Sequence, residues 1–235
     1  MTLDILKRDD LQLGGFAGLK EHRLIVDSRV GGQDDTWNGI GNLVYLADAK
    51  FDPYGETRMH PHHEIDVISV MVEGNINHEG SLEHGGSIKR NQVQVQRAGG
   101  EGFRHNEINP DANQNRMIQL WVLPETSGEP AGYKLYDLNP GGLIQIYGGC
   151  KEQTDTMDGA TILEVGLFDQ RQGFDKSVST NDSVIIYITR GAGQLSENSG
   201  STTEVTDGDL IRGKGLGFVA TTDDTQLILI RTGHI

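Results

Sequence analysis

The 235-residue chain has a single cysteine, six prolines and no long apolar run. One cysteine excludes an intramolecular disulfide framework, and we expect Cys150 to be a small buried hydrophobe. No segment approaches the roughly 18 apolar residues of a membrane-spanning helix, and the first ten residues lack the apolar stretch of a signal peptide. We therefore expect a cytoplasmic protein, in a reducing compartment, that does not contact the membrane.

Basic residues are also scarce. The chain has 20 Lys and Arg against 34 Asp and Glu, which gives a formal net charge of -14. Such a field repels a phosphate backbone. We therefore expect no direct binding of nucleic acid.

Glycine, by contrast, is abundant, with 32 residues against an ordinary usage of about 7%. Short apolar bursts alternate with glycine- and asparagine-rich turns, a pattern typical of a β-sandwich or barrel. No long amphipathic helix is evident, and residues 92–96 alternate strictly, as in a half-buried strand. The expected strands lie at residues 42–47, 67–72, 92–96, 117–123, 143–147, 161–168, 184–189, 216–220 and 226–231.

The chain repeats itself weakly. Residues 67–74 resemble residues 184–191 at an offset of 117, and residues 100–103 are echoed by residues 215–218 at an offset of 115. Repetition at half the chain length predicts two copies of one β domain. Prolines and glycines cluster between 124 and 142, so we expect domains at residues 1–130 and 131–235.

Two pairs of potential metal ligands occur in the first copy, His60 with His62 and His105 with Glu107. Residues i and i+2 of a strand share one face. Two such pairs facing each other across a barrel would bring three imidazoles and one carboxylate to one point. Those donors suit divalent iron, manganese, cobalt, nickel, copper or zinc, and a six-coordinate ion would keep two positions for reactants.

The repeat offers a check on this interpretation. At the two offsets, the four residues fall on Ser177, Ser179, Ala220 and Thr222. The second copy has thus lost all four candidate ligands together, as a single metal site in the first copy predicts.

Other polar residues near the two pairs have simpler interpretations. His63 points away from His60 and His62, and we expect it to be solvated. His78 and His84 lie in a polar, turn-rich stretch and are expected at the surface.

Three further polar side chains could face the ligands. Glu64 and Asp66 lie on the ligand face only if the strand is regular, where each is either an acceptor that orients an imidazole or an ordinary solvated carboxylate. Gln119, in phase with Trp121, either joins the core or faces the cavity.

Ordered motifs at these positions resemble the pirin family of double cupins. They are His60-Pro61-His62, Val72-Glu73-Gly74, Gln94 through Ala98-Gly99, His105-x-Glu107 and residues 117–124, within a match that covers residues 50–135. The chain departs from the family at Asp66, where a glutamate is usual, and at Phe103, where an aliphatic residue is usual and an aromatic ring narrows the pocket.

The resemblance implies an all-β fold of two tandem cupin barrels. It implies one non-haem metal, Fe(II) in first place, held in the N-terminal barrel by His60, His62, His105 and Glu107. Some members are quercetin 2,3-dioxygenases, which open a flavonol ring and release carbon monoxide. Applied here, Glu107 is the catalytic base that takes the proton of the flavonol hydroxyl.

The resemblance leaves a second function open. Other pirins act as metal- or redox-dependent regulators that bind a protein partner. A flavonol site requires an open apolar cavity at the ligands, whereas a regulator can have a closed one.

Overall fold

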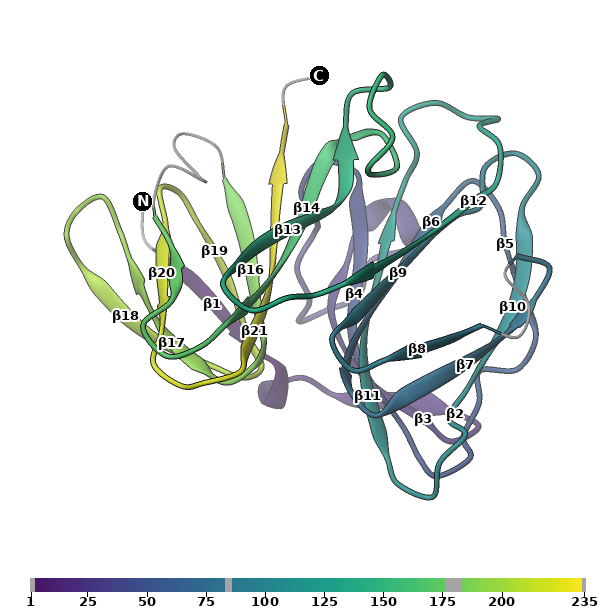
Figure 1. Ribbon diagram of the computed structural model, residues 1–235, viewed down its shortest axis with the longest axis horizontal. Helices are drawn as coiled ribbons and strands as arrows, with labels where there is room; N and C mark the ends of the chain where they lie inside the picture. Colours follow the sequence, from purple (N-terminus) through teal and green to yellow (C-terminus); the bar gives the residue numbers. More distant parts are fainter. Residues whose placement is uncertain (1–2, 83–85, 176–182, 234–235) are drawn as a thin grey trace. The chain divides into compact units, whose positions relative to one another are not determined.

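A computed structural model describes residues 3–82, 86–175 and 183–233 of the chain. These residues form β-strands joined by turns, with two short 3-10 helices, η1 (Arg8–Asp10) and η2 (Ser28–Val30), and no α-helix among them. The chain divides into two compact units, Leu11–Asp137 and Met1–Asp10 with Leu138–Ile235. Each unit holds one large and one small antiparallel sheet (Figure 1). No described helix has the length and apolar character needed to cross a membrane.

The first unit contains a seven-stranded and a four-stranded sheet. The larger sheet has the order β12 (Gly132–Asp137), β9 (Gln92–Arg97), β6 (Asp66–Glu73), β11 (Asn115–Val122), β4 (Leu43–Phe51), β3 (Leu19–Val26) and β2 (Leu13–Phe16). The smaller has the order β5 (His60–His62), β10 (Phe103–Ile108), β7 (Asn75–Gly80) and β8 (Ser87–Lys89).

The second unit repeats this plan. Its larger sheet has the order β1 (Asp4–Lys7), β19 (Asp209–Gly213), β16 (Val184–Arg190), β21 (Thr225–Thr232), β14 (Gly159–Phe168) and β13 (Gly142–Gly149). Its smaller sheet has the order β15 (Gly173–Phe174), β20 (Gly217–Ala220), β17 (Ala192–Ser196) and β18 (Thr202–Thr206). All nine expected strands are present, because alternating apolar residues can bury one face of a sheet against the other.

The division of the chain differs from the predicted boundary between residues 130 and 131. Strand β12 pairs with β9 over all six of its residues, so the first unit continues to Asp137. Strand β1 pairs with β19 and belongs to the second unit. The proline- and glycine-rich stretch at residues 124–142 contains β12, and strand pairing across the sheets decides which unit each edge strand joins.

The two units are related strand by strand, and the registers define equivalent residues. Val70 pairs with Val93 as Tyr187 pairs with Leu210, an offset of 117 on both strands. Glu107 lies opposite His78, and Phe218 lies opposite Leu195. Phe218 therefore takes the place of Glu107, and by the same register Leu216 takes that of His105.

This register corrects two predicted equivalents. Ala220 and Thr222 do not occupy the places of His105 and Glu107. The connection before β20 is shorter than the one before β10, so the offset falls from 117 on the preceding strands to 111 on β20 and not to 115. The other two expected equivalents, Ser177 and Ser179, lie outside the described residues.

The interiors of the two units differ in polarity. The second unit is filled by an apolar cluster that spans both of its sheets and includes Leu195, Leu216 and Phe218. In the first unit an apolar cluster around Phe51 and Met71 fills only part of the interior. Polar side chains occupy the rest, and they form the site described below.

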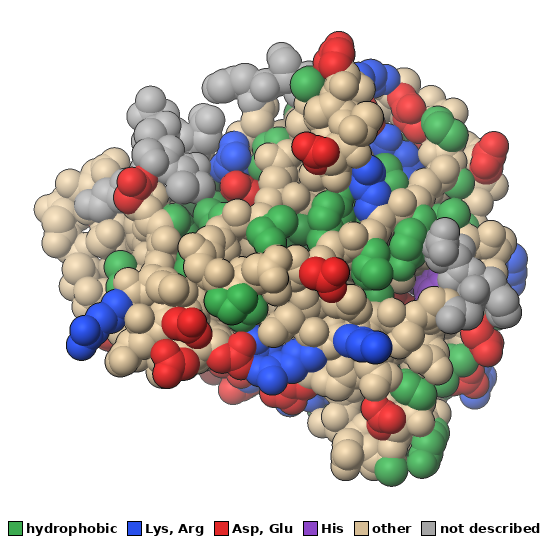
Figure 2. Space-filling view, viewed as in Figure 1, with side chains coloured by type: hydrophobic (Ala, Val, Ile, Leu, Met, Phe, Trp, Pro, Cys, Tyr) green, Lys and Arg blue, Asp and Glu red, His purple; other side chains and the backbone are tan. Residues whose placement is uncertain are grey.

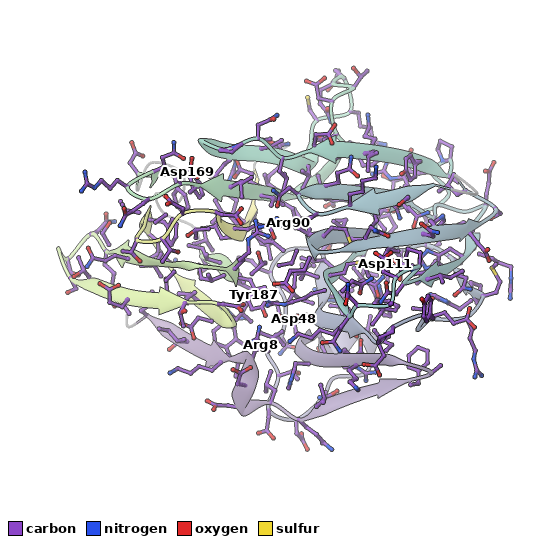
Figure 3. The ribbon with its side chains drawn as sticks, turned by 60° about the horizontal axis from the view of Figure 1, so that its bottom comes forward. Arg8, Asp48, Arg90, Asp111, Asp169 and Tyr187 are labelled. Atoms are coloured by element: carbon purple, nitrogen blue, oxygen red, sulfur yellow. The ribbon has the colours of Figure 1, made fainter. Side chains whose placement is uncertain are left out.

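A buried ion pair ties two strands of the first unit together. Arg116 on β11 lies with Nη2 2.5 Å from Oδ2 of Asp48 on β4, and both side chains are almost fully buried. Figure 3 shows Asp48 among the strands of this sheet. Removing one partner of such a pair leaves an uncompensated buried charge, so the pair links β11 to β4 in addition to their backbone pairing.

Two expectations about burial are wrong. Cys150 is exposed; it lies between the end of β13 and a turn at residues 151–152. Strand β9 is buried on both faces, and its glutamines point inward where a half-buried strand would present them to water.

Gly74 forms the turn between β6 and β7 with a φ of 72°, and a Cβ placed there would lie 2.8 Å from Cβ of Asn115. Gly128 has a similar φ of 81° but open space around it. We expect Gly74→Ala to destabilise the protein by roughly 1–3 kcal/mol more than Gly128→Ala, because crowding adds to the left-handed strain that both share.

Urea unfolding of the two variants and the unmodified protein measures this difference. Equal losses of stability in both variants would show that the contact with Asn115 relaxes freely.

Candidate metal centre

Three imidazoles meet in the interior of the first unit. Strand pairing places His105 opposite His60 and Phe103 opposite His62, so both ligand pairs lie on one face of the smaller sheet. His105 Nε2 is 3.0 Å from His60 Nε2 and 3.1 Å from His62 Nε2. Among the described residues these three form the one group of three or more side chains placed to hold a metal ion.

Hydrogen bonds at the far side of two rings fix their tautomers. Nδ1 of His60 is 2.8 Å from the carbonyl oxygen of Arg58, and Nδ1 of His105 is 3.2 Å from Oε1 of Gln96. Each oxygen is an acceptor, so each Nδ1 carries the proton and each Nε2 presents a lone pair. Two lone pairs therefore face each other at 3.0 Å.

That arrangement is unfavourable unless a cation lies between the nitrogens. Two imidazole nitrogens bound about 2.1 Å from one ion at a right angle are about 3.0 Å apart. The observed separations of 3.0 and 3.1 Å match this value. The three histidines therefore fit a divalent transition metal.

Burial keeps these rings neutral. His62 is 9% exposed and His105 is fully buried. Burial, with the neighbouring imidazole of His60, lowers the pKa of His62 to about 4. Burial and the other three histidines lower the pKa of His105 to about 2. A metal ligand must be deprotonated, so neither ring has to lose a proton to bind a metal at neutral pH.

Glu107 lies two residues after His105 on β10 and is 1% exposed. The Ser69 hydroxyl donates to its Oε1 at 3.2 Å, and the Gln119 amide donates to its Oε2 at 3.2 Å. Its carboxylate is not part of the imidazole group, so a fourth ligand here stays a prediction. Burial raises the pKa of Glu107 to about 7, although both hydrogen bonds oppose the shift.

The prediction for His78 is wrong, and that for His63 is confirmed. His78 is 1% exposed, with its Nε2 3.0 Å from Nδ1 of His105. It lies on β7 two residues after the buried Ile76, so the alternation of the strand turns it inward. His63 is exposed and contacts the carbonyl oxygen of Gly100. His84 lies outside the described residues.

The strand that carries His60 and His62 is not regular beyond His62. Glu64 has a φ of +51°, so it and Asp66 do not continue the ligand face. Oε1 of Glu64 accepts from the backbone N–H of Gly128, and Asp66 forms a buried ion pair with Arg97. Gln119, for which two placements were open, points toward the ligand residues and donates to Glu107.

Sequence reasoning missed Ser69, Gln94 and Gln96, which all point into this site. The signal for the glutamines was available, because a polar residue at every second position of a strand in a barrel marks one face. That face was taken to be the solvated one.

Aromatic side chains wall the site. The Phe103 ring lies 5.1 Å from the rings of both His62 and His105. The rings of Trp121 and His62 meet edge to face with their centres 5.8 Å apart, and Trp121 stacks on Tyr45 at 4.3 Å. Figure 2 shows histidine at only one small spot of the face in view, toward the right.

The chain is similar in sequence to pirins and to quercetin 2,3-dioxygenases. Residues 43–122 match the Pirin family model. The chain is 25% identical over 194 residues to a pirin-like protein of Caulobacter vibrioides, which is 81% of this chain and 83% of that protein. It is 29% identical over 102 residues to quercetin 2,3-dioxygenase of Escherichia coli, 43% and 44% of the two chains.

The structure of a bacterial pirin of Escherichia coli in complex with nickel(II) covers 100% of both chains with a TM-score of 0.80 at 15% identity. At 15% identity this similarity shows the fold alone. The predicted all-β fold of two tandem cupin barrels is thereby confirmed.

The pKa of Glu107 predicts how stability changes with pH in the metal-free protein. Its folded value of about 7 exceeds the ordinary value of 4.5. Between those values the folded state holds a proton that the unfolded chain has lost, so this group reduces stability as pH rises through the window. Glu107→Gln cannot ionise, so its stability relative to the unmodified protein should improve by roughly 3 kcal/mol between about pH 4 and pH 8.

Urea unfolding in the presence of a chelator, at several pH values, measures this change. A difference between the two proteins that is independent of pH would contradict the raised pKa.

Proposed function

The chain belongs to the pirin family, and we propose that it is a metal-dependent dioxygenase of the quercetin 2,3-dioxygenase type. The proposed ligands are His60, His62, His105 and Glu107. The observation that carries the proposal is the approach of two imidazole lone pairs to 3.0 Å. A cytoplasmic location is proposed with it, on the chain's single cysteine.

The metal proposed is Fe(II), with manganese, nickel, cobalt, copper and zinc as the other candidates. Imidazole suits iron, nickel, copper and zinc, and mixed imidazole and carboxylate ligands with open positions are typical of non-haem iron oxygenases. Nickel(II) is the ion in the structurally similar pirin of Escherichia coli. The metal, when bound, would supply Lewis-acid polarisation of an oxygen ligand of the substrate.

The protein's own groups would handle the proton. A general base works best when its pKa is near the operating pH. Burial raises the pKa of Glu107 to about 7 in the metal-free protein, and a bound cation would lower that pKa, so Glu107 would act as the base once its carboxylate leaves the metal. Oε1 and Oε2 of Glu107 are held by Ser69 and Gln119. Glu107 is therefore proposed both as the fourth ligand and as the group that accepts the proton of a phenolic hydroxyl.

The proposed substrate is a small planar phenol such as a flavonol. Phe103 and Trp121 beside His62 offer flat apolar surfaces that favour an aromatic ring. His60 is the most exposed of the three histidines, so the substrate would approach from its side.

One observation favours a second function, that of a metal-dependent regulator that binds a protein partner. His62, His105 and Glu107 are at most 9% exposed, which is closer to a closed site than to an open substrate cavity. In this alternative the metal would change the surface near His60 and alter binding to a partner.

His60 and His63 provide a matched pair of variants. We expect His60→Ala to lower nickel(II) or iron(II) affinity at least about tenfold, because one of three converging nitrogens is lost. His63→Ala should bind like the unmodified protein, because His63 faces Gly100 at the surface. Equilibrium dialysis with metal analysis measures both, and equal affinities would refute the site.

Activity is then measured as aerobic loss of quercetin absorbance with carbon monoxide detection, using protein loaded with each candidate metal. Turnover that requires His60 supports the dioxygenase. Full metal loading without turnover would contradict quercetin as the substrate and favour the regulator.

A further inference from the structure

A buried hydrogen-bonded relay lies behind His105, on the side away from His60 and His62. Nδ1 of His105 is 3.2 Å from Oε1 of Gln96 and 3.0 Å from Nε2 of His78. Gln96 Nε2 is 3.1 Å from His78 Nε2, and Gln94 Nε2 donates to Gln96 Oε1 at 2.9 Å. Gln94, Gln96 and His78 are at most 2% exposed.

The orientations of the Gln94 and Gln96 side-chain amides set the donors and acceptors of the relay. The Gln94 amide donates one N–H to Gln96 Oε1, and the Gln96 amide nitrogen faces His78. That nitrogen can only donate, so Nε2 of His78 is an acceptor. Both atoms that face Nδ1 of His105 are then acceptors, and Nδ1 must carry the proton.

The relay therefore determines which nitrogen of His105 presents a lone pair. If the proton moved to Nε2, it would point at His60 and His62. Nδ1 would then present a lone pair to two acceptors inside the protein, which is unfavourable for a buried polar atom. The ring is thus held in the one tautomer that can bind a metal through Nε2.

The second unit shows what replaces the relay where metal ligands are absent. The registers place Leu195 at the position of His78 and Ile211 at that of Gln94. At the same offset Gly213 takes the position of Gln96. Leu195 and Ile211 belong to the apolar cluster of that unit. The barrel can therefore close and pack without these polar groups.

The acceptor for the His105 proton is also chemically distinctive. A carboxylate in that place would accept a stronger hydrogen bond from Nδ1 and make the imidazole a stronger electron donor to the metal. The amide oxygen of Gln96 is neutral and accepts a weaker hydrogen bond. A neutral acceptor leaves a bound ion more electron-poor and hence a stronger Lewis acid.

We propose that Gln96 and His78, oriented by Gln94, are positioning residues for the metal centre. They hold His105 in its metal-binding tautomer and keep its donor strength low. This inference rests on the proposed metal site, and it adds three residues that the ligand pattern alone does not reveal.

Substitutions of Gln96 in opposite chemical directions test the proposal. Gln96→Leu removes the acceptor and should weaken nickel(II) or cobalt(II) binding roughly 10–100-fold. Gln96→Glu supplies a carboxylate and should instead tighten binding and shift the Fe(III)/Fe(II) potential to more negative values. His78→Leu should also weaken nickel(II) or cobalt(II) binding, as Gln96→Leu does.

Gln92 provides the matched control. It lies in the same row of β9, but its amide donates to Asp137 and its oxygen accepts from the backbone of Lys89. Gln92→Leu should leave metal affinity, the visible spectrum of the cobalt(II) protein and the iron potential unchanged. Circular dichroism and thermal melting of each metal-free variant establish that it is folded.

The outcomes separate this inference from the proposed function. Absence of metal binding by the unmodified protein would overturn both. Normal binding by the unmodified protein, with Gln96→Leu and Gln92→Leu alike in affinity and cobalt(II) spectrum, would overturn the relay alone. If Gln96→Leu does not fold, Gln96→Glu decides, because an unchanged affinity and potential would overturn the proposal.

Discussion

The site depends on the short distance between two imidazole nitrogens that both present lone pairs. His60 Nε2 and His105 Nε2 lie 3.0 Å apart, while the far nitrogen of each ring donates to a fixed oxygen. Such a contact is favourable only with a cation between the rings. The protein supports it by burying the rings among aromatic side chains and by anchoring both with hydrogen bonds.

The strand framework of the first unit does not depend on these polar contacts. The second unit forms the same kind of framework without them. The second unit has the same strand order, yet Phe218 and Leu195 stand where the first unit has Glu107 and His78. Apolar contacts stabilise that interior. In the first unit part of this stabilisation is replaced by a polar cluster whose members satisfy one another, and the chemistry of the site follows from that replacement.

Much of this could be predicted from the sequence, and the failures have specific causes. His60 and His62 were found because the i, i+2 rule is local to one strand. His78 was misplaced because its neighbours are polar and its burial depends on β10, which is distant in sequence. The equivalents of His105 and Glu107 were misplaced because loop lengths differ between the copies.

The sequence by itself determined the strands, the duplication and the three histidines, because alternation and ligand spacing are properties of short segments. Only the tertiary structure decided that β1 joins the second unit and that Gln96 and His78 stand behind His105. It also showed that the two carboxylate oxygens of Glu107 accept hydrogen bonds from Ser69 and Gln119. These facts depend on pairing between distant strands, which local patterns do not encode.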